Sequence, residues 1–315
     1  MNIVVLDGNC VNPGDLSWDA LSQFGEYKVY DRTAPNLVIE RAKDADILVT
    51  NKVVIDKNIM DNLPNLKLIC ILATGYNTID TEYAREKGII VSNIPAYSTK
   101  AVAQLVFAYI LKFAFNVEIH SKSVHDGDWV TCPDFCYQVT PLFELQNKTI
   151  GIIGYGSIGK QVAKIASAFD MKVLATSKSR TSGNDEYADF ADIDTILANS
   201  DIVSIHTPLT PETTGMANAE FFAKMKNTAY FINTSRGPVV NEQDLRNALD
   251  NGIIAGAAVD VLSQEPCHPN NPLLGSSCLI TPHIAWAPVE TRQRLMDIFI
   301  ENIRAFIAGK PQNTV

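Results

Sequence analysis

Short apolar runs alternate with segments of helical periodicity along most of the chain, the pattern of parallel sheets covered by helices. A first series of apolar runs predicts strands at residues 2–6, 28–30, 47–50, 66–72 and 89–92. A second series predicts strands at residues 150–153, 171–176, 202–206, 228–233, 253–261 and 279–281. The segments between the later strands, at residues 193–198, 221–225 and 245–251, have the spacing of helices. We therefore expect an α/β protein with two doubly wound parallel sheets.

Two longer helices are predicted between and after these series. Residues 98 to about 115 are apolar on almost every side, so this helix must be covered by other parts of the protein. We interpret it as a central helix between two domains, with one face open to burial by a second subunit. Residues 289–308 are amphipathic and are expected to cross back to the first domain, making that domain discontinuous.

The boundary between the two domains is expected where Pro95 interrupts the pattern and Ser98 can cap the next helix. With the returning helix included, the expected domains are residues 1–97 plus 287–315, and residues 98–286.

Residues 116–147 form a stretch of mixed polarity that carries several aromatic side chains. A long irregular stretch is uncommon inside a compact domain, so we interpret it as a functional or intersubunit arm. The alternative is a surface loop with a small cluster of its own.

A glycine-rich turn follows the first strand of the second domain, in the segment KTIGIIGYGSIGK at residues 148–160. Gly154, Gly156 and Gly159 fit the pattern G-x-G-x-x-G, which allows a tight turn, a close approach of backbone to a pyrophosphate, and tight packing of helix on strand. The helix that begins near Ser157 would point its free N–H groups at the phosphates. Such turns also simply end strands, but the apolar strand before it and the helical pattern after it favour a dinucleotide site.

The residues at the end of the following strand indicate whether the protein uses NAD or NADP. Proteins that select NAD usually place an acid about 20 residues beyond the glycine loop, where it binds the ribose hydroxyls. Here Ser177 occupies that place, and Lys178 and Arg180 follow it as candidates to hold a 2′-phosphate. The sequence therefore favours NADP over NAD, with use of both as the alternative. The two cations could also be ordinary solvated loop charges.

The composition excludes several classes of protein. The net charge is −9 and no block of Lys or Arg stands out, which argues against nucleic acid and membrane surfaces as partners. Six cysteines are scattered without a C-x-x-C pair or a secretory signal, which is typical of a reduced cytoplasmic protein. Cys132 and Cys136 lie close in sequence but lack a second pair, so no metal site is expected.

Three residues near the ends of predicted strands could act together in one reaction. They are Arg236, Glu265 and His283. Reduction of a carbonyl by hydride needs a cation to orient the substrate and an acid to protonate the oxygen, and Arg and His supply these. A carboxylate beside an imidazole fixes its tautomer and stabilises the imidazolium. Each residue alone also has an ordinary explanation, as a surface ion pair, a solvated turn or a buried histidine.

The chain resembles the D-isomer-specific 2-hydroxyacid dehydrogenases over essentially its whole length. The resemblance depends on long motifs that occur in the family's order: ATGYNTID at residues 73–80, VSNIPAYST at 91–99, the glycine loop, HTPLTPETTGM at 206–216, INTSRGPVVNEQDL at 232–245, AAVDV at 257–261 and TPHIAWAPVETR at 281–292. The resemblance implies a flavodoxin-like substrate domain formed by both ends of the chain and a Rossmann cofactor domain inserted between them. It also implies a cleft between the domains and a homodimer built through the cofactor domains, with residues 116–147 as the dimerisation arm.

The family's residue roles carry over to matching positions of this sequence. Arg236 would bind the carboxylate and carbonyl, His283 would be the acid/base, and Glu265 would be its partner. The turn Ala73-Thr74-Gly75 would present backbone N–H groups to the substrate carboxylate. The expected cofactor contacts are Gly154, Tyr155, Gly156, Ser157, Ile158, Ser177, Lys178, Arg180, Thr207, Pro208, Thr234, Ser235, Asp260 and His283.

Within the family, the motifs at residues 73–80 and 91–99 look most like those of glycerate dehydrogenases. The predicted activity is therefore NAD(P)H-dependent reduction of hydroxypyruvate or glyoxylate to D-glycerate or glycolate, and the reverse reaction. One alternative is a phosphoglycerate-type dehydrogenase, which would need more basic residues near its substrate than Lys52 alone. Another is a dinucleotide-sensing binding protein of the corepressor type, which can keep the same three residues.

Overall fold

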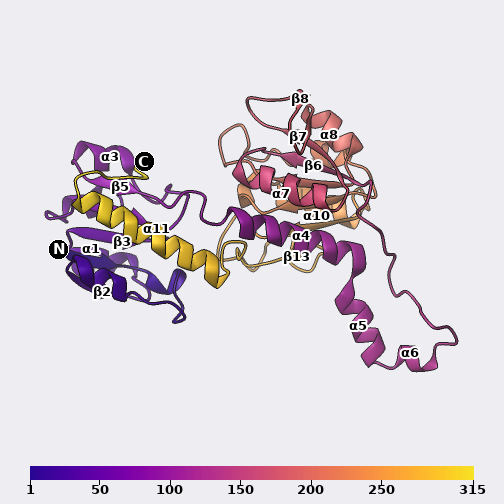
Figure 1. The fold of residues 1–315 in the computed structure, drawn as a ribbon, viewed down its shortest axis with the longest axis horizontal. Coiled ribbons are helices and arrows are strands. Elements are labelled where there is room, and N and C mark those ends of the chain that lie inside the picture. Colours follow the sequence, from indigo (N-terminus) through magenta and orange to yellow (C-terminus); the bar gives the residue numbers. More distant parts are fainter. The chain divides into compact units, whose positions relative to one another are not determined.

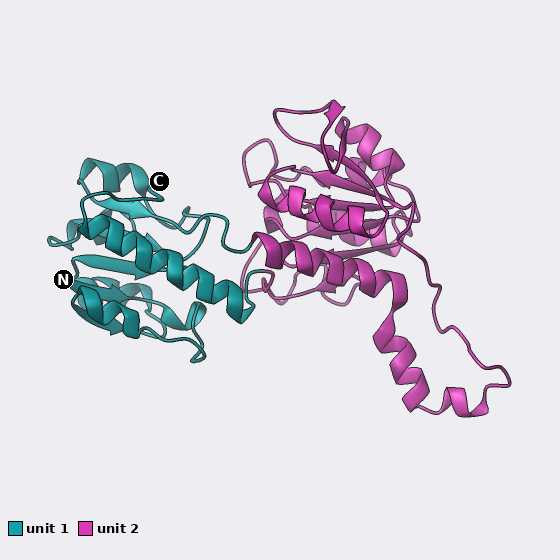
Figure 2. Ribbon diagram, viewed as in Figure 1, with its two compact units in different colours: residues 1–98, 286–315 teal, residues 99–285 magenta.

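The computed structural model describes all 315 residues and shows two compact units (Figure 2). Unit 1 contains Met1–Ser98 and Trp286–Val315, and unit 2 contains Thr99–Ala285. Each bound differs by one residue from the expected domain boundary.

Unit 1 is built around a parallel sheet of five strands in the order β2-β1-β3-β4-β5 (Figure 1). The strands are β1 (Asn2–Val5), β2 (Glu26–Val29), β3 (Ile47–Thr50), β4 (Leu68–Ile71) and β5 (Ile90–Ser92). The helices are α1 (Val38–Ala42), α2 (Lys57–Asp61), α3 (Thr81–Glu86) and α11 (Val289–Ile307). Every residue of β3 and β4 is buried, as expected for central strands covered on both faces. The strand order is the flavodoxin-like one.

The returning helix α11 completes the core of unit 1. Its apolar stripe, Leu295, Phe299 and Ile303, is fully buried against one face of the sheet. Near its start, the guanidinium of Arg292 donates to both carboxylate oxygens of Asp15, at 2.7 and 2.6 Å. The helix is therefore held to unit 1 both by apolar burial and by a two-pronged ion pair.

Unit 2 contains a sheet of eight strands in the order β13-β12-β11-β10-β6-β7-β9-β8, parallel except for β8. The strands are β6 (Thr149–Ile153), β7 (Lys172–Thr176), β8 (Gly183–Asn184), β9 (Asp189–Phe190), β10 (Ile202–Ile205), β11 (Tyr230–Asn233), β12 (Gly256–Val259) and β13 (Leu279–Ile280). The helices are α4 (Thr99–Phe115), α5 (Val117–His125), α6 (Asp128–Thr131), α7 (Ser157–Ala168), α8 (Ile193–Asn199), α9 (Ala219–Ala223) and α10 (Glu242–Asp250). This is the Rossmann order, in which the chain reverses direction across the sheet between β6 and β10.

Helix α4 belongs to the core of unit 2. Val106, Tyr109 and Ile110 are buried on it, and the helix packs against α7. This packing covers most of the apolar surface of α4, although Leu111 and Phe115 near its end stay exposed.

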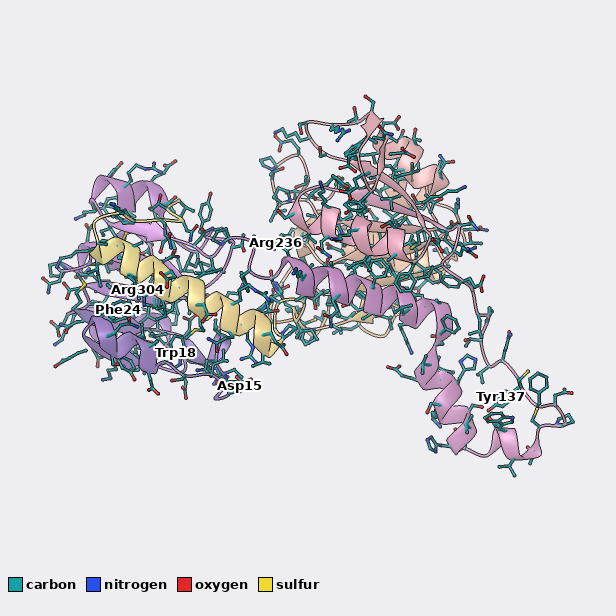
Figure 3. All side chains as sticks on the ribbon, viewed as in Figure 1. Asp15, Trp18, Phe24, Tyr137, Arg236 and Arg304 are labelled. Carbon is teal, nitrogen blue, oxygen red and sulfur yellow. The ribbon has the colours of Figure 1, made fainter.

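The arm at residues 116–147 differs from its prediction. An irregular stretch was expected throughout, but α5 and α6 occupy its first half, and only the part after α6 is irregular (Figure 1). The helical half is stabilised by local polar contacts rather than by a core: Lys122 pairs with Asp126 at 2.5 Å, and the Ser123 hydroxyl lies 3.0 Å from that of Tyr137 (Figure 3). Val130 and Phe135 are 86% and 88% exposed, so the arm buries little of its apolar surface within one chain.

No single helix has the length and hydropathy needed to cross a membrane, although α4 and α5, which meet at 50°, reach that length and composition when taken together.

Candidate active site

The glycine loop joins β6 to α7, and two of its three glycines are required by packing. Gly154 has φ +104°, and a Cβ there would lie 2.6 Å from the backbone carbonyl carbon of His206. A Cβ on Gly159 would lie 2.4 Å from the carbonyl oxygen of Gly154. A Cβ on Gly156 would meet nothing within 4 Å. Packing therefore does not explain Gly156, whereas the close approach of a phosphate to the backbone would.

The start of α7 offers free donors beside this loop. The backbone N–H groups of Ser157 and Ile158 have no acceptor in the protein, as expected for the first turn of a helix. Tyr155 differs, because its N–H donates to the carbonyl of Thr176 at 3.1 Å and its hydroxyl donates to Asp185 at 3.0 Å. The anion-binding capacity of the loop thus lies at residues 156–158.

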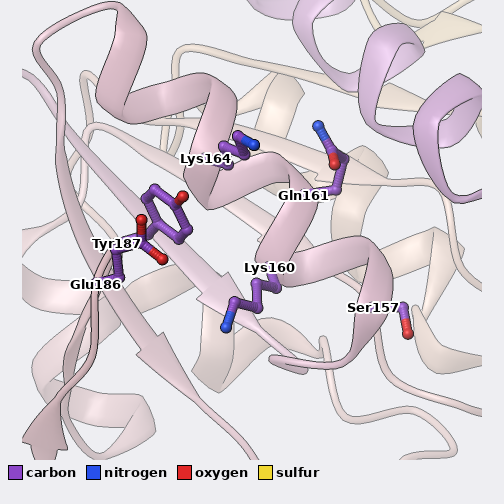
Figure 4. A pocket seen from close by; sticks show the side chains of 6 residues that line it. All are labelled: Ser157, Lys160, Gln161, Lys164, Glu186 and Tyr187. Atoms are coloured by element: carbon purple, nitrogen blue, oxygen red, sulfur yellow. The ribbon is translucent and has the colours of Figure 1, made fainter.

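A shallow hollow of about 330 Å³ lies between α7 and the loop before β9 (Figure 4). Its lining includes Lys160 and Lys164 from the helix and Glu186 and Tyr187 from the loop. Ser157, the first residue of α7, also lines it, so the hollow reaches the predicted phosphate site, but none of the residues at the carboxyl ends of β10, β11 and β12 lines it.

Buried hydroxyls without partners mark the carboxyl edge of the sheet. Thr207 follows β10 and Thr234 follows β11, and the Oγ1 atom of each is buried without a hydrogen bond. Unpaired buried hydroxyls are costly and call for an explanation. A polar ligand lying along the strand ends would satisfy both, so these residues, with the glycine loop, fit a bound dinucleotide.

The end of β7 lacks a carboxylate, as the sequence indicates, and its two cations have different surroundings. The guanidinium of Arg180 lies over the ring of Phe190 at 3.9 Å and donates to the carbonyl of Asn184. Lys178 is exposed and makes no contact with an acid. Ser177 forms a tight turn with Arg180 through paired backbone hydrogen bonds. Lys178 is therefore the readier of the two cations to meet a phosphate.

His206 is partly buried at the end of β10, with its Nδ1 atom shielded from solvent, and this burial makes the fold sensitive to acid. Burial lowers the pKa of His206 from 6.5 to about 4, and its Nδ1 atom has no partner. Because the folded-state pKa lies below the unfolded one, stability is present above about pH 6.5 and is lost as the pH falls toward 4. We expect the free energy of unfolding to fall by about 2 kcal/mol from this residue between about pH 7 and pH 5.

Urea unfolding at the two pH values measures that loss. The His206→Asn variant should lose less stability than the natural chain over the same interval, whereas replacement of the exposed His125 by asparagine should leave the loss unchanged. An equal loss in the His206→Asn variant would contradict the prediction.

The loop after β11 is shaped by one buried amide. Asn233 is fully buried, and its Oδ1 atom accepts hydrogen bonds from the N–H and the hydroxyl of Ser235 at 2.9 and 2.8 Å. Its Nδ2 atom donates to the carbonyl of Arg236 at 3.0 Å. The side chain of Arg236 is exposed, and its Nη1 atom donates to the Ser235 carbonyl at 2.8 Å (Figure 3). Asn233 thus fixes the backbone from which an accessible guanidinium projects.

Gly237 brings this loop against the loop after β12. A Cβ at residue 237 would lie 1.9 Å from the carbonyl carbon of Leu262, a separation that no side chain tolerates. The N–H of Leu262 in turn donates to Oε1 of Glu265 at 3.1 Å. The absence of a side chain at Gly237 therefore allows the loops that carry Arg236 and Glu265 to lie in direct contact.

His283 and Glu265 form a pair. The Nδ1 atom of His283 lies 2.7 Å from Oε2 of Glu265, and the two side chains are 29% and 35% exposed. With Nδ1–H donating to the carboxylate, the other ring nitrogen, which makes no hydrogen bond within the protein, is left to exchange a proton with a ligand. The backbone of His283 has φ +53°, an uncommon conformation for a residue with a side chain, and such strain often occurs at functional positions.

Asp260 holds the backbone of the loop that carries His283. Its buried carboxylate accepts hydrogen bonds from the N–H groups of Ile284 and Ala285, at 2.8 and 2.9 Å, and from the hydroxyl of Thr281. The hydroxyl of Tyr109, on α4, bonds to Thr281 and must donate, because the Thr281 proton goes to Asp260. Burial raises the pKa of Asp260, while its hydrogen bonds act in the opposite direction.

The predicted substrate turn lies in unit 1, after β4. The carbonyl of Ala73 accepts from the N–H of Ile94 at 3.0 Å, and the hydroxyl of Thr74 donates to the Ile94 carbonyl at 2.8 Å. The N–H groups of Thr74 and Gly75 have no acceptor in the protein. The turn is therefore held rigidly while two of its donors stay available, as a carboxylate site requires.

The structure brings together some of the predicted residues and adds others. It pairs Glu265 with His283 and places Arg236 on the loop that touches the Glu265 loop, all within unit 2. Sequence reasoning gave no role to Asn233, Thr281 or Tyr109. A buried polar residue at a strand end could have suggested Asn233, but no local pattern marks Tyr109, which lies on an apolar helix and acts on a segment distant in sequence.

The family model for the NAD-binding domain of D-isomer-specific 2-hydroxyacid dehydrogenases matches residues 107–285. The chain is 47% identical over 320 aligned residues to a hydroxypyruvate reductase of Blautia hydrogenotrophica, covering 100% of this chain and 99% of the relative. It is 41% identical to a glycerate dehydrogenase of Methylorubrum extorquens, covering 92% of each.

A solved structure of an acyclic imino acid reductase in complex with NADPH and D-arginine superposes with a TM-score of 0.87, at 32% identity and over 100% of both chains. The matches to the two relatives and to the solved structure extend over both units. The match to the family model for the NAD-binding domain lies within unit 2, where the glycine loop and the unpaired threonine hydroxyls are found. The chain binds a pyridine nucleotide and belongs to the D-isomer-specific 2-hydroxyacid dehydrogenase family of oxidoreductases.

Proposed function

We propose that this chain reduces a small 2-oxo acid, hydroxypyruvate or glyoxylate, to D-glycerate or glycolate with NADPH or NADH. The observation that carries the proposal is the pairing of His283 with Glu265 at 2.7 Å, together with the contact of the Glu265 loop with the loop that holds Arg236. The names of the relatives, hydroxypyruvate reductase and glycerate dehydrogenase, support this choice of substrate. Unit 1 would bind the substrate and unit 2 the cofactor.

The proposed reaction uses the chain's own groups for binding and for proton transfer. A bound reduced nicotinamide supplies the hydride that reaches the carbonyl carbon. Arg236 orients the carboxylate and polarises the carbonyl, and the N–H groups of Thr74 and Gly75 bind the carboxylate. His283 gives the proton from its free ring nitrogen to the carbonyl oxygen, while Glu265 stabilises the imidazolium before the transfer and keeps the ring in place.

On the cofactor side, we propose that the N–H groups of residues 156–158 bind the pyrophosphate. Thr207 and Pro208 would lie along the adenosine, and Thr234, Ser235, Asp260 and His283 would surround the nicotinamide. Asp260 would act mainly by holding the His283 loop, since its carboxylate already accepts three hydrogen bonds. Residues 177–180 would carry the choice between the two cofactors.

The assay for this function is loss of reduced-cofactor absorbance with hydroxypyruvate, glyoxylate and a panel of larger 2-oxo acids. Saturable consumption with the two small acids, and formation of the D-product, is the expected result. Absence of consumption with every acid, although NADPH or NADH still binds, would overturn the proposal and favour a dinucleotide-sensing protein.

We propose NADP as the preferred cofactor, because the end of β7 presents Ser177 and the exposed Lys178 in place of an acid. A Ser177→Asp substitution is expected to change the ratio of kcat/KM for NADPH over NADH about 100-fold toward NADH, since a carboxylate repels the 2′-phosphate and accepts from the ribose hydroxyls. Steady-state kinetics with both cofactors measures the ratio. The control is Ser167→Asp, which adds the same charge to an exposed position at the far end of α7; an unchanged ratio in Ser177→Asp would contradict the proposal.

We also propose that a second copy of the chain covers the arm, forming a homodimer through the cofactor units. The strongly exposed side chains of Val130 and Phe135 support this, because apolar groups so far from any core favour burial by a partner. Light scattering on the natural chain should give the mass of a dimer, and a Val130→Glu/Phe135→Glu variant should be monomeric.

A further inference from the structure

Unit 1 contains a pocket of about 480 Å³ that is lined by none of the residues to which the proposed reaction assigns a role. It lies just beyond the carboxyl ends of β1, β2 and β3, where Asp7, Arg32 and Lys52 follow the three strands. In the strand order β2-β1-β3, the chain passes from β1 to β2 on one side of β1 and then crosses to β3 on the other side of β1. Ligands of doubly wound sheets bind at such reversal points, and the volume is in the range of small-molecule sites.

Two cations in the pocket have no acidic partner. The side chains of Arg32 and Lys52 are exposed, and neither forms an ion pair or a side-chain hydrogen bond within the protein. Other exposed cations of unit 1, such as Lys57 and Lys67, do pair with nearby acids. Arg32 and Lys52 thus present unused donors toward the same hollow.

The acids of the pocket are already occupied by backbone donors. Asp7 is buried, and its carboxylate accepts from the N–H groups of Asn51 and Lys52, at 2.8 and 2.7 Å. Asp56 caps α2 by accepting from the N–H of Ile59 at 2.9 Å. Both carboxylates thus accept hydrogen bonds that stabilise the fold, whereas the two cations have no hydrogen-bonding role in it.

An apolar wall completes the pocket, formed by Val38, Ile39, Val53 and Ile59. We propose that the pocket binds a small organic anion, a carboxylate or a phosphate monoester, with its charged group on Arg32 and Lys52 and its carbon chain against this wall. The site is distinct from the substrate turn, because residues 73–75 do not line it.

Calorimetric titration of the full chain with butanoate and with butyl phosphate tests the proposal, and tells the two head groups apart. Saturable binding of at least one of them is expected, while neutral 1-butanol should not bind. An Arg32→Gln/Lys52→Gln variant should bind the anion about tenfold more weakly or worse. A Lys43→Gln variant, which removes an exposed cation of unit 1 outside the pocket, should bind normally. No binding of either anion, or equal binding by the double variant, would overturn the proposal.

Two further measurements locate the site. Cys10 also lines the pocket and is exposed, so the bound anion should slow its alkylation by iodoacetamide without slowing that of the exposed Cys136. An Arg236→Gln variant should keep the same affinity, because Arg236 lies in the proposed active site and not in this pocket. Loss of binding in that variant, or equal alkylation of Cys10 with and without the anion, would place the anion elsewhere and refute the assignment. An Asp56→Asn variant, which can still cap α2, should bind at least as tightly; weaker binding would refute the role of the cations.

Discussion

Replacing His283 with alanine is expected to lower kcat for hydroxypyruvate reduction about 100-fold or more, the usual worth of a general acid. The expectation follows from the geometry, because the His283 ring is held by Glu265 through one nitrogen and leaves the other free for proton transfer. Cofactor binding should largely persist, since the substitution removes one proposed contact with the nicotinamide and leaves the glycine loop untouched. Steady-state kinetics together with cofactor titration measure both quantities.

Two variants show whether the loss reflects proton transfer. His268→Ala removes an exposed histidine on the same long loop as Glu265 and should retain normal turnover. Glu265→Gln keeps the size of the side chain but removes its charge, so it should lower kcat by less than His283→Ala does and alter the pH profile of kcat. Near-normal turnover in His283→Ala would exclude this residue as the acid.

The second large effect is expected from Arg236→Lys, which should lower kcat/KM for the 2-oxo acid about 100-fold. A guanidinium can bind a carboxylate through two parallel hydrogen bonds, and an ammonium cannot reproduce that geometry. The Arg236 side chain is exposed and bonds only to the neighbouring Ser235 carbonyl, so a substrate can recruit it without breaking an ion pair.

Kinetics with varied substrate and a fixed, saturating cofactor concentration would reveal this effect mainly as a raised KM. Arg85→Lys, at an exposed site on α3, provides a control that should behave as the natural chain does. If the Arg236→Lys protein keeps its affinity for the 2-oxo acid, the substrate carboxylate must be bound by other groups.

The fold class could be predicted from the sequence because the strands are short, continuous apolar runs, which is how central parallel strands appear. The predicted runs at residues 47–50 and 66–72 correspond to β3 and β4, whose residues are all buried. The hairpin of β8 and β9 was not predicted, because each strand has two residues and carries no recognisable periodicity.

The arm shows a different limit of sequence reasoning. α5 has few buried residues, so its hydrophobic pattern is weak, and local contacts such as Lys122 with Asp126 decide its conformation. Pattern reading favours elements that pack on a core, and this segment has almost none of its own.

In the candidate site, the sequence suggested the side chains that are proposed to carry the chemistry, but not the residues that hold them. Arg236, Glu265 and His283 could be named from residue type and motif. The contact of Gly237 with Leu262, and the hydrogen bonds from Tyr109 through Thr281 to Asp260, join segments far apart in the chain. Such contacts depend on the tertiary fold and leave no trace in local spacing.

The confinement of the histidine, its carboxylate and the arginine to a single folded unit has a consequence for how the protein can tolerate change. If unit 1 binds the substrate, as proposed, substitutions in its surface loops would change which acid is bound and would leave the residues proposed to move the proton untouched. New substrate preferences could therefore arise by altering one unit alone, while the reaction chemistry is inherited intact from the other.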